Sequence, residues 1–234
     1  MIDAFRVTWQ SIKDLWDEFV FLIMLNIVWS LSILLAAAPL LLWGLENPLP
    51  TLGLSLLLSI PVPIITGALC FVTNQIAHEK AVGWDTFLAG LRRYWLKSLA
   101  VAVINLLVLI LVAANIQFYA FILQGSWTAL AVAGWIVLGI YWLISQVYWF
   151  PMILELESEK LLLALRNALS LVLVTPGFSL MLIVILFILT ILGIGLTVPV
   201  PLFMVVLLLL ITNHATISRI AAIRKRHEAR KRDE

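Results

Sequence analysis

Two amide side chains set in long apolar stretches are the groups best placed for binding chemistry in this chain. Asn26 and Asn105 each lie about 10–12 Å from the charged end of their stretch, at the helical rise of about 1.5 Å per residue. An amide at that depth can bind a polar solute, or it can join two helices through a hydrogen bond. The second use predicts that Asn26 and Asn105 bond to each other or to nearby backbone, and so tie the first apolar helix to the third.

A second group of polar residues lies where the apolar stretches end. These residues are Asn74, Gln75, His78, Gln146, Glu155, Glu157, Asn213 and His214, with Thr73 and Thr212 beside them. A histidine near a carboxylate can bind a metal ion. However, the chain has no H-x-x-x-H or H-x-x-E-H spacing, and polar residues at this level are typical of ordinary helix ends. We therefore expect neither a metal site nor a cofactor.

Catalytic motifs are missing from the sequence. It contains no G-x-S-x-G, no H-E-x-x-H and no Gly-Lys phosphate loop. No Asp or Glu lies deep in an apolar stretch, which disfavours proton-coupled transport. Cys70 is the single cysteine, so an internal disulfide is excluded. We expect that the protein is not an enzyme.

The composition is that of a membrane protein. Hydrophobic residues make up 63% of the 234 residues and charged residues only 12%, whereas soluble domains have about 45–50% and about 25%. A soluble fold cannot hide this excess, because it still needs a polar surface. The apolar stretches therefore predict an all-α integral membrane protein that is built from transmembrane helices.

Six spans in three hairpins account for residues 19–222. We predict them at 19–43, 61–78, 98–123, 127–151, 178–198 and 199–220. Prolines at 61 and 63 leave two alternatives for residues 52–60, because proline interrupts a helix interior but suits a helix start. Residues 52–60 form either a short outer helix of their own or the first part of one kinked helix.

Three polar segments with helical periodicity lie outside these spans. Residues 1–18 carry apolar side chains at alternating steps of three and four, which predicts an amphipathic helix in the headgroup plane. Residues 84–95 repeat that pattern before the third span, and residues 161–174 form a second connecting helix. Residues 223–234 are a basic tail.

All 15 Lys and Arg residues fall on one side of this arrangement, and Glu46 is the only charge on the other side. The positive-inside rule then places both termini in the cytoplasm, with the protein in the plasma membrane. Anionic lipid headgroups are the expected partners of this basic face, and nucleic acid is not expected. The candidate headgroup contacts are Arg92, Arg93, Lys97, Arg224, Lys225 and Arg226.

Internal similarity accompanies the hairpins. PVPIITGALCFVTN at 61–74 resembles PVPLFMVVLLLLITN at 199–213, and FLAGLRR at 87–93 resembles LLLALRN at 161–167. Either the chain repeats a unit of amphipathic helix, span, turn and span, or apolar sequences match by chance. A true repeat would pack three hairpins around a pseudo-symmetric centre, as many transport folds do.

Several stretches resemble the YesL-like family of bacterial membrane proteins of unknown function. They are LNIVWSLSILLAAAP, the P-x-x-x-G-A-L-x-x-V-T-N pattern around 63–74, WDTFLAGLRRYWLKSLAVAVINLL, YWFPMILELE and LRNALSLVLVTPG. The resemblance implies a six-helix bacterial inner-membrane protein, sometimes associated with carbohydrate uptake, and supplies no catalytic residues. We expect a non-enzymatic accessory or assembly component of a solute uptake system, with a membrane-protein partner. The alternative is a transporter or channel for a small neutral solute.

Overall fold

A computed structural model describes residues 2–44, 46–123, 125, 127–197 and 200–233. Every regular element within these ranges is helical. Six helices are long and apolar enough to cross a membrane. The prediction of an all-α, six-span membrane protein is confirmed.

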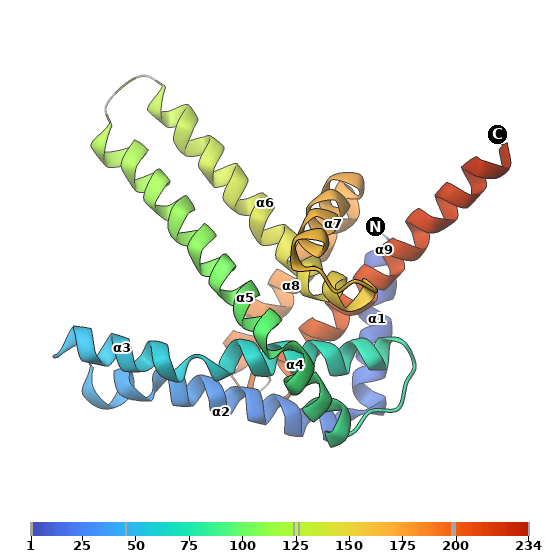
Figure 1. Ribbon diagram of the computed structural model, residues 1–234, viewed down its shortest axis with the longest axis horizontal. Coiled ribbons are helices and arrows are strands. Elements are labelled where there is room, and N and C mark those ends of the chain that lie inside the picture. The colour runs from blue at the N-terminus through green and yellow to red at the C-terminus, as the bar shows by residue number, and fades with distance from the viewer. Residues whose placement is uncertain (1, 45, 124, 126, 198–199, 234) are drawn as a thin grey trace.

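The first hairpin follows an amphipathic helix. After α1 (Ile2–Asp17), α2 (Phe19–Trp43) runs away from α1 and ends at Gly44, whose φ of 59° suits a residue without Cβ. The return path is α3 (Pro48–Leu58) followed by α4 (Pro61–Ala77). The helix is interrupted by a turn at residues 59–60, but α3 and α4 run in the same direction on either side of it (Figure 1). The outer segment is thus a separate helix in line with the span, and it begins at Pro48 rather than at residue 52.

The second hairpin corrects one predicted boundary. Residues 84–95 and the span at 98–123 form a single helix, α5 (Trp84–Gln117), which ends in the π-helical turn η1 (Phe118–Ile122). The amphipathic segment needs no break after it, because no proline or glycine separates Gly90 from the apolar stretch. The hairpin returns through α6 (Thr128–Glu155).

The third hairpin is preceded by α7 (Leu161–Val174). Its first span is α8 (Pro176–Leu196), which begins with proline in the first turn. The π-helical turn η2 (Val200–Met204) leads into α9 (Val205–Asp233). The helix α9 therefore includes most of the predicted tail at 223–234, and it extends beyond the bundle (Figure 1).

The same packing recurs three times around the centre. The second helices of the three hairpins, α4, α6 and α9, contact one another. Each of them is covered by the helix that begins the next unit: α5 covers α4, α7 covers α6, and α1 covers α9. The last of these contacts joins the two ends of the chain, so the units form a closed ring. This arrangement agrees with the repeat suggested by the sequence.

Two of the hairpins diverge away from this centre. The α5–α6 hairpin points away from the α2–α3–α4 hairpin, and together they make a V (Figure 1). In the most apolar 18-residue stretch of the helix Trp84–Ile122, no residue is buried. The narrow end of the V lies near Gly67 and Ser98, where α4 and α5 are in close contact.

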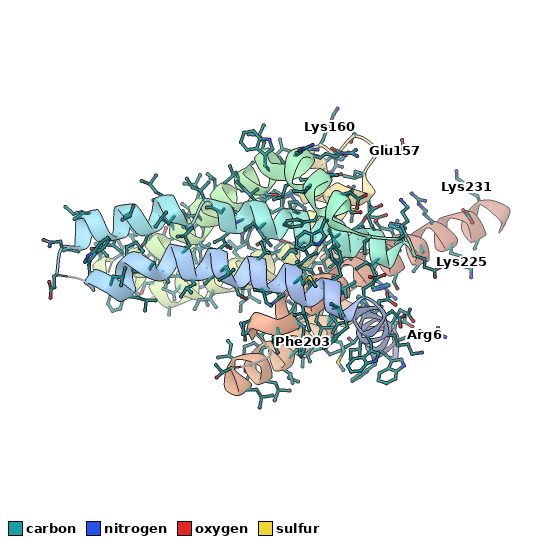
Figure 2. All side chains as sticks on the ribbon, turned by 90° about the horizontal axis from the view of Figure 1, so that it is seen from below. Arg6, Glu157, Lys160, Phe203, Lys225 and Lys231 are labelled. Atoms are coloured by element: carbon teal, nitrogen blue, oxygen red, sulfur yellow. The ribbon has the colours of Figure 1, made fainter. Side chains whose placement is uncertain are left out.

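The labelled charged side chains gather at the end of the bundle that lies opposite the open hairpin ends (Figure 2). Arg6, Glu157, Lys160, Lys225 and Lys231 all lie toward the end at which α9 leaves (Figure 2). The helix α1 crosses this end with one face on α9, where Ala4, Val7, Ser11 and Leu15 are buried. Its other face exposes apolar side chains at steps of three and four, which are Phe5, Trp9, Ile12 and Trp16. This geometry suits a helix that rests on a membrane surface.

Candidate functional site

A cleft of about 450 Å³ lies at the narrow end of the V, between α4, α5, α6 and α9. Its lining is mostly apolar with a few polar groups, and its volume falls in the range of about 300–1,000 Å³ that is usual for ligand sites. The residues that line it are Val62, Pro63, Thr66, Gly67, Cys70, Ser98, Val101, Ala102, Asn105, Gln146, Val147, Phe150, Pro151, Leu209 and Thr212. The cleft is the principal candidate site of the membrane region.

Trp142 holds two of the predicted amides in this cleft. Its indole Nε1 donates to Asn105 Oδ1 at 3.0 Å, and its backbone carbonyl accepts from Gln146 Nε2 at 3.2 Å. An indole N–H can only donate and a carbonyl can only accept, so these bonds fix the orientation of both amides. Asn105 Nδ2 and Gln146 Oε1 have no protein partner within the described part of the chain. Among the described residues, these two amides therefore offer the cleft a donor and an acceptor that have no protein partner.

Asn26 does not lie in this cleft and does not bond Asn105, so that alternative is wrong, whereas the predicted bonding to backbone is found for Asn26. Asn26 is fully buried against the start of the last span. Its Oδ1 accepts from the backbone N–H groups of Val205 and Val206 at 3.1 and 3.2 Å, and its Nδ2 donates to the carbonyl of Val200 at 2.7 Å. These three bonds all fall where the turn η2 passes into α9, and the first N–H groups of a helix generally lack partners within it.

The inner ends of the three central helices meet in a polar cluster. Asn74 Nδ2 donates to Glu155 Oε1 at 2.8 Å and to Asn213 Oδ1 at 3.3 Å, and His78 Nε2 lies 2.8 Å from the same Glu155 oxygen. Asn213 is fully buried and also donates to Thr73 Oγ1 at 2.9 Å. Asn74 and Asn213 are the equivalent residues of the two similar PVP stretches, so the repeat-related positions contact each other.

Gln75 belongs to the edge of this polar cluster. Its Nε2 contacts Asn74 Oδ1 at 3.4 Å, and its Oε1 accepts from Lys80 at 3.2 Å. Across the residues whose structure is described, no group of three His, Cys, Asp or Glu side chains could hold a metal ion. Each central amide is engaged by its neighbours, which is the pattern of a junction between helices rather than of a binding site.

Two further pairs fasten α1 to α9. His214 Nε2 lies 2.6 Å from Asp14 Oδ2, with both side chains about 15% exposed. Arg219 pairs with Asp3 at 3.0 Å, and its guanidinium covers the Phe178 ring at 4.0 Å. His214, which the sequence placed among the inner polar residues, is therefore an anchor for the N-terminal helix.

Two of the predicted headgroup residues have a protein partner instead. Arg93 and Lys97 both bind the carboxylate of Glu159, which also accepts from the Tyr94 hydroxyl at 3.0 Å. Glu159 lies in the turn that precedes α7 and adopts a positive φ of 46°. Arg92, Arg224 and Lys225 are exposed, as headgroup contacts would require. The side chain of Arg226 lies outside the described residues.

Acidification is expected to weaken the Glu159 attachment. Burial alone would raise the pKa of Glu159, but the hydrogen bonds from Lys97, Tyr94 and Arg93 together lower the pKa below its ordinary value of 4.5. A lowered pKa contributes stability that is present above the unfolded pKa and is lost as pH falls through the folded pKa. The melting temperature of wild type should therefore exceed that of Glu159→Gln near neutral pH, and this difference should shrink below pH 4.5.

Thermal unfolding in detergent between pH 7 and pH 3 measures this difference. Glu157→Gln is the matched control, because Glu157 is exposed in the same turn and makes no ion pair with any described residue. A wild-type advantage that stays constant down to pH 3 would contradict the role of the Glu159 carboxylate.

Three residues of these sites had no individual signal in the sequence. Trp142 looked like one of many apolar side chains, Glu159 like a solvated charge, and Asp14 like the polar face of an amphipathic helix. The negative charges of Glu159 and Asp14 could only have suggested that each pairs with some basic residue or histidine, without indicating which one. Comparison of the chain with family models, with curated proteins and with solved structures finds no match.

Proposed function

We propose that this chain is a non-enzymatic accessory protein of the plasma membrane, which holds a second membrane protein between its diverging hairpins. The observation that carries the proposal is the isolation of the α5–α6 hairpin. Helices in a bilayer associate through close packing, and the apolar stretch of α5 has no buried residue. A partner helix in the V would supply the packing that the chain itself does not make there.

The resemblance to the YesL-like family suggests which partner this is. We propose the membrane component of a solute uptake system, with carbohydrates as its substrate class. The exposed Arg92, Arg224 and Lys225 would contact anionic headgroups on the cytoplasmic side, each contributing roughly 1 kcal/mol. The sequence motifs absent from the chain support the non-enzymatic part of the proposal.

Site-specific photo-crosslinking in cells tests the partner. A photoreactive residue at Leu107 of α5 or Leu138 of α6 should give a protein adduct of defined mass, and mass spectrometry should identify it as a transport subunit. Leu192 of α8 is the matched control, since Leu107, Leu138 and Leu192 are between 54% and 60% exposed. Adducts with lipid alone at all three positions would contradict the accessory role.

A transporter or channel for a small neutral solute is the second candidate. The free amide groups of Asn105 and Gln146 in the cleft favour it. The burial of Asn26 disfavours transport, because Asn26 and Asn105 then do not line a common route for a solute. Flux of neutral sugars into proteoliposomes that contain the pure protein, abolished by Asn105→Leu, would support transport over the accessory role.

The orientation is a separate prediction. Single cysteines at Glu46 and Thr197, placed in a Cys70→Ala background, should react with an impermeant thiol reagent from outside intact cells. Cysteines at Lys80, Lys160 and Lys231 should react only after the membrane is opened, because the positive-inside rule keeps the basic end in the cytoplasm. Labelling at Lys80, Lys160 or Lys231 in intact cells would reverse the orientation.

A further inference from the structure

We propose that the cleft between α4, α5, α6 and α9 binds one neutral lipid that carries a free hydroxyl group, such as a diacylglycerol. The hydroxyl would lie between Asn105 and Gln146, and the acyl chains would extend toward the open side of the V. This inference concerns a ligand of the membrane itself, and it does not depend on the accessory role.

The hydrogen-bonding groups of the cleft match a hydroxyl. Asn105 Nδ2 is a free donor and Gln146 Oε1 is a free acceptor, and a hydroxyl both accepts and donates. The hydroxyls of Thr66, Ser98 and Thr212 already donate to the carbonyls of Val62, Tyr94 and Leu209 on their own helices, so they can only accept from a ligand. Among the described residues, the Asn105 and Gln146 amides supply the side-chain donor and acceptor that have no protein partner.

The charge and the depth of the cleft exclude a phospholipid headgroup. None of the residues that line the cleft is charged. Asn105 lies eight residues beyond Lys97 and Gln146 nine residues before Glu155, which places both amides about 12 Å or more along their helices from charged positions. Half of a hydrocarbon core is about 15 Å thick. A charged headgroup at that depth is costly, whereas a single hydroxyl with two partners is not.

The shape of the cleft suits a molecule that arrives from the bilayer. The two hairpins that flank it diverge (Figure 1). Its lining is mostly apolar, with residues from α4 and α5 on facing sides. Pro151 has no backbone N–H, which also leaves the carbonyl of Val147 without its usual helical partner at the cleft wall. A soluble polar ligand would instead need a route lined by polar groups, and the fully buried Asn26 does not extend one.

A comparison of three lipids on the wild-type protein is the first test. The purified protein is incubated in detergent with equal amounts of dioleoylglycerol, triolein and dioleoylphosphatidylcholine, and bound lipid is read by native mass spectrometry. Triolein replaces the hydroxyl by a third ester. We expect one dioleoylglycerol per chain, retained at least tenfold over the other two lipids.

Variants of the cleft are the second test. Asn105→Leu combined with Gln146→Leu should reduce retention of dioleoylglycerol about tenfold, since each lost hydrogen bond in a membrane weakens binding roughly threefold. Asn115→Leu combined with Gln117→Leu is the matched control, with the same substitutions on α5 outside the cleft. The control should retain the lipid as wild type does. Ala102→Phe, which fills the cleft, should also remove it.

Four results would overturn the proposal. They are equal retention of triolein and dioleoylglycerol, preferred retention of the phospholipid, unchanged retention in the cleft double variant, and displacement of dioleoylglycerol by a soluble neutral sugar. Displacement by a sugar would instead support a solute-binding role for the cleft, as the transport hypothesis requires. If the double variant does not yield folded protein, the comparison of the three lipids on the wild-type protein still tests the proposal.

Discussion

Replacing Asn26 by leucine should lower the unfolding free energy by about 3 kcal/mol or more. The substitution removes the three hydrogen bonds that Asn26 makes to the N–H groups of Val205 and Val206 and to the carbonyl of Val200. Loss of a partner from a buried polar group costs about 1–3 kcal/mol, and hydrocarbon offers no water as a substitute. Asn26 is fully buried, so rearrangement cannot bring solvent to these groups.

Denaturation in mixed detergent micelles measures this loss, and Asn105→Leu is the matched control. Asn105 bonds only the indole of Trp142 among the described residues, so its replacement should cost about 0.6–1 kcal/mol. The two losses should add, because the amides share no partner. A loss from Asn26→Leu no larger than that from Asn105→Leu would show that the start of α9 does not depend on this side chain.

Replacing Gly67 by alanine should cost about 1–3 kcal/mol, the usual range for overpacking. A Cβ on Gly67 would lie 1.8 Å from Ser98 Oγ and 2.9 Å from Ser98 Cβ. The helices α4 and α5 would have to separate at the narrow end of the V. Small residues allow this kind of close approach between membrane helices.

Ser98→Gly should restore part of that loss in the Gly67→Ala background, because it removes the two Ser98 atoms and leaves only Phe150 Cζ, at 2.9 Å from the added Cβ. Gly134→Ala in α6 is the control, and it should raise rather than lower the unfolding free energy, since nothing lies within 4 Å of its added Cβ. A helix interior gains stability from that change, up to about 1 kcal/mol. Equal effects of Gly67→Ala and Gly134→Ala would mean that α4 and α5 are not closely packed at Gly67.

The helices were predictable because the signals that define them are local. Apolar runs, prolines at helix starts and the glycine at the end of α2 gave six spans whose positions agree closely with the helices. Local signals also explain the one wrong boundary, between residues 84–95 and the third span, which the structure joins in a single helix. A change from amphipathic to uniformly apolar sequence marks a change of surroundings, and it does not require a break in the helix.

The partners of the polar side chains were not predictable. Asn26 bonds residues 174 to 180 positions away, and Asp14 pairs with a histidine 200 positions away. Such pairs depend on how complete hairpins pack, which periodicity does not encode. Arg93 and Lys97 look like headgroup residues in the sequence, because their partner Glu159 lies more than 60 positions away in the turn before α7.

The contact between α1 and α9 has a consequence for biosynthesis. Ribosomes make α1 first and α9 last, and the His214–Asp14 and Arg219–Asp3 pairs join segments 200 and 216 residues apart. The first two hairpins can enter the bilayer while α1 still lacks its partner, since chains generally fold in the order of synthesis. The helix α1 can therefore dock on α9 only after α9 has been synthesised. Until then the face of α1 that carries Ala4 and Ser11 has no α9 to cover it.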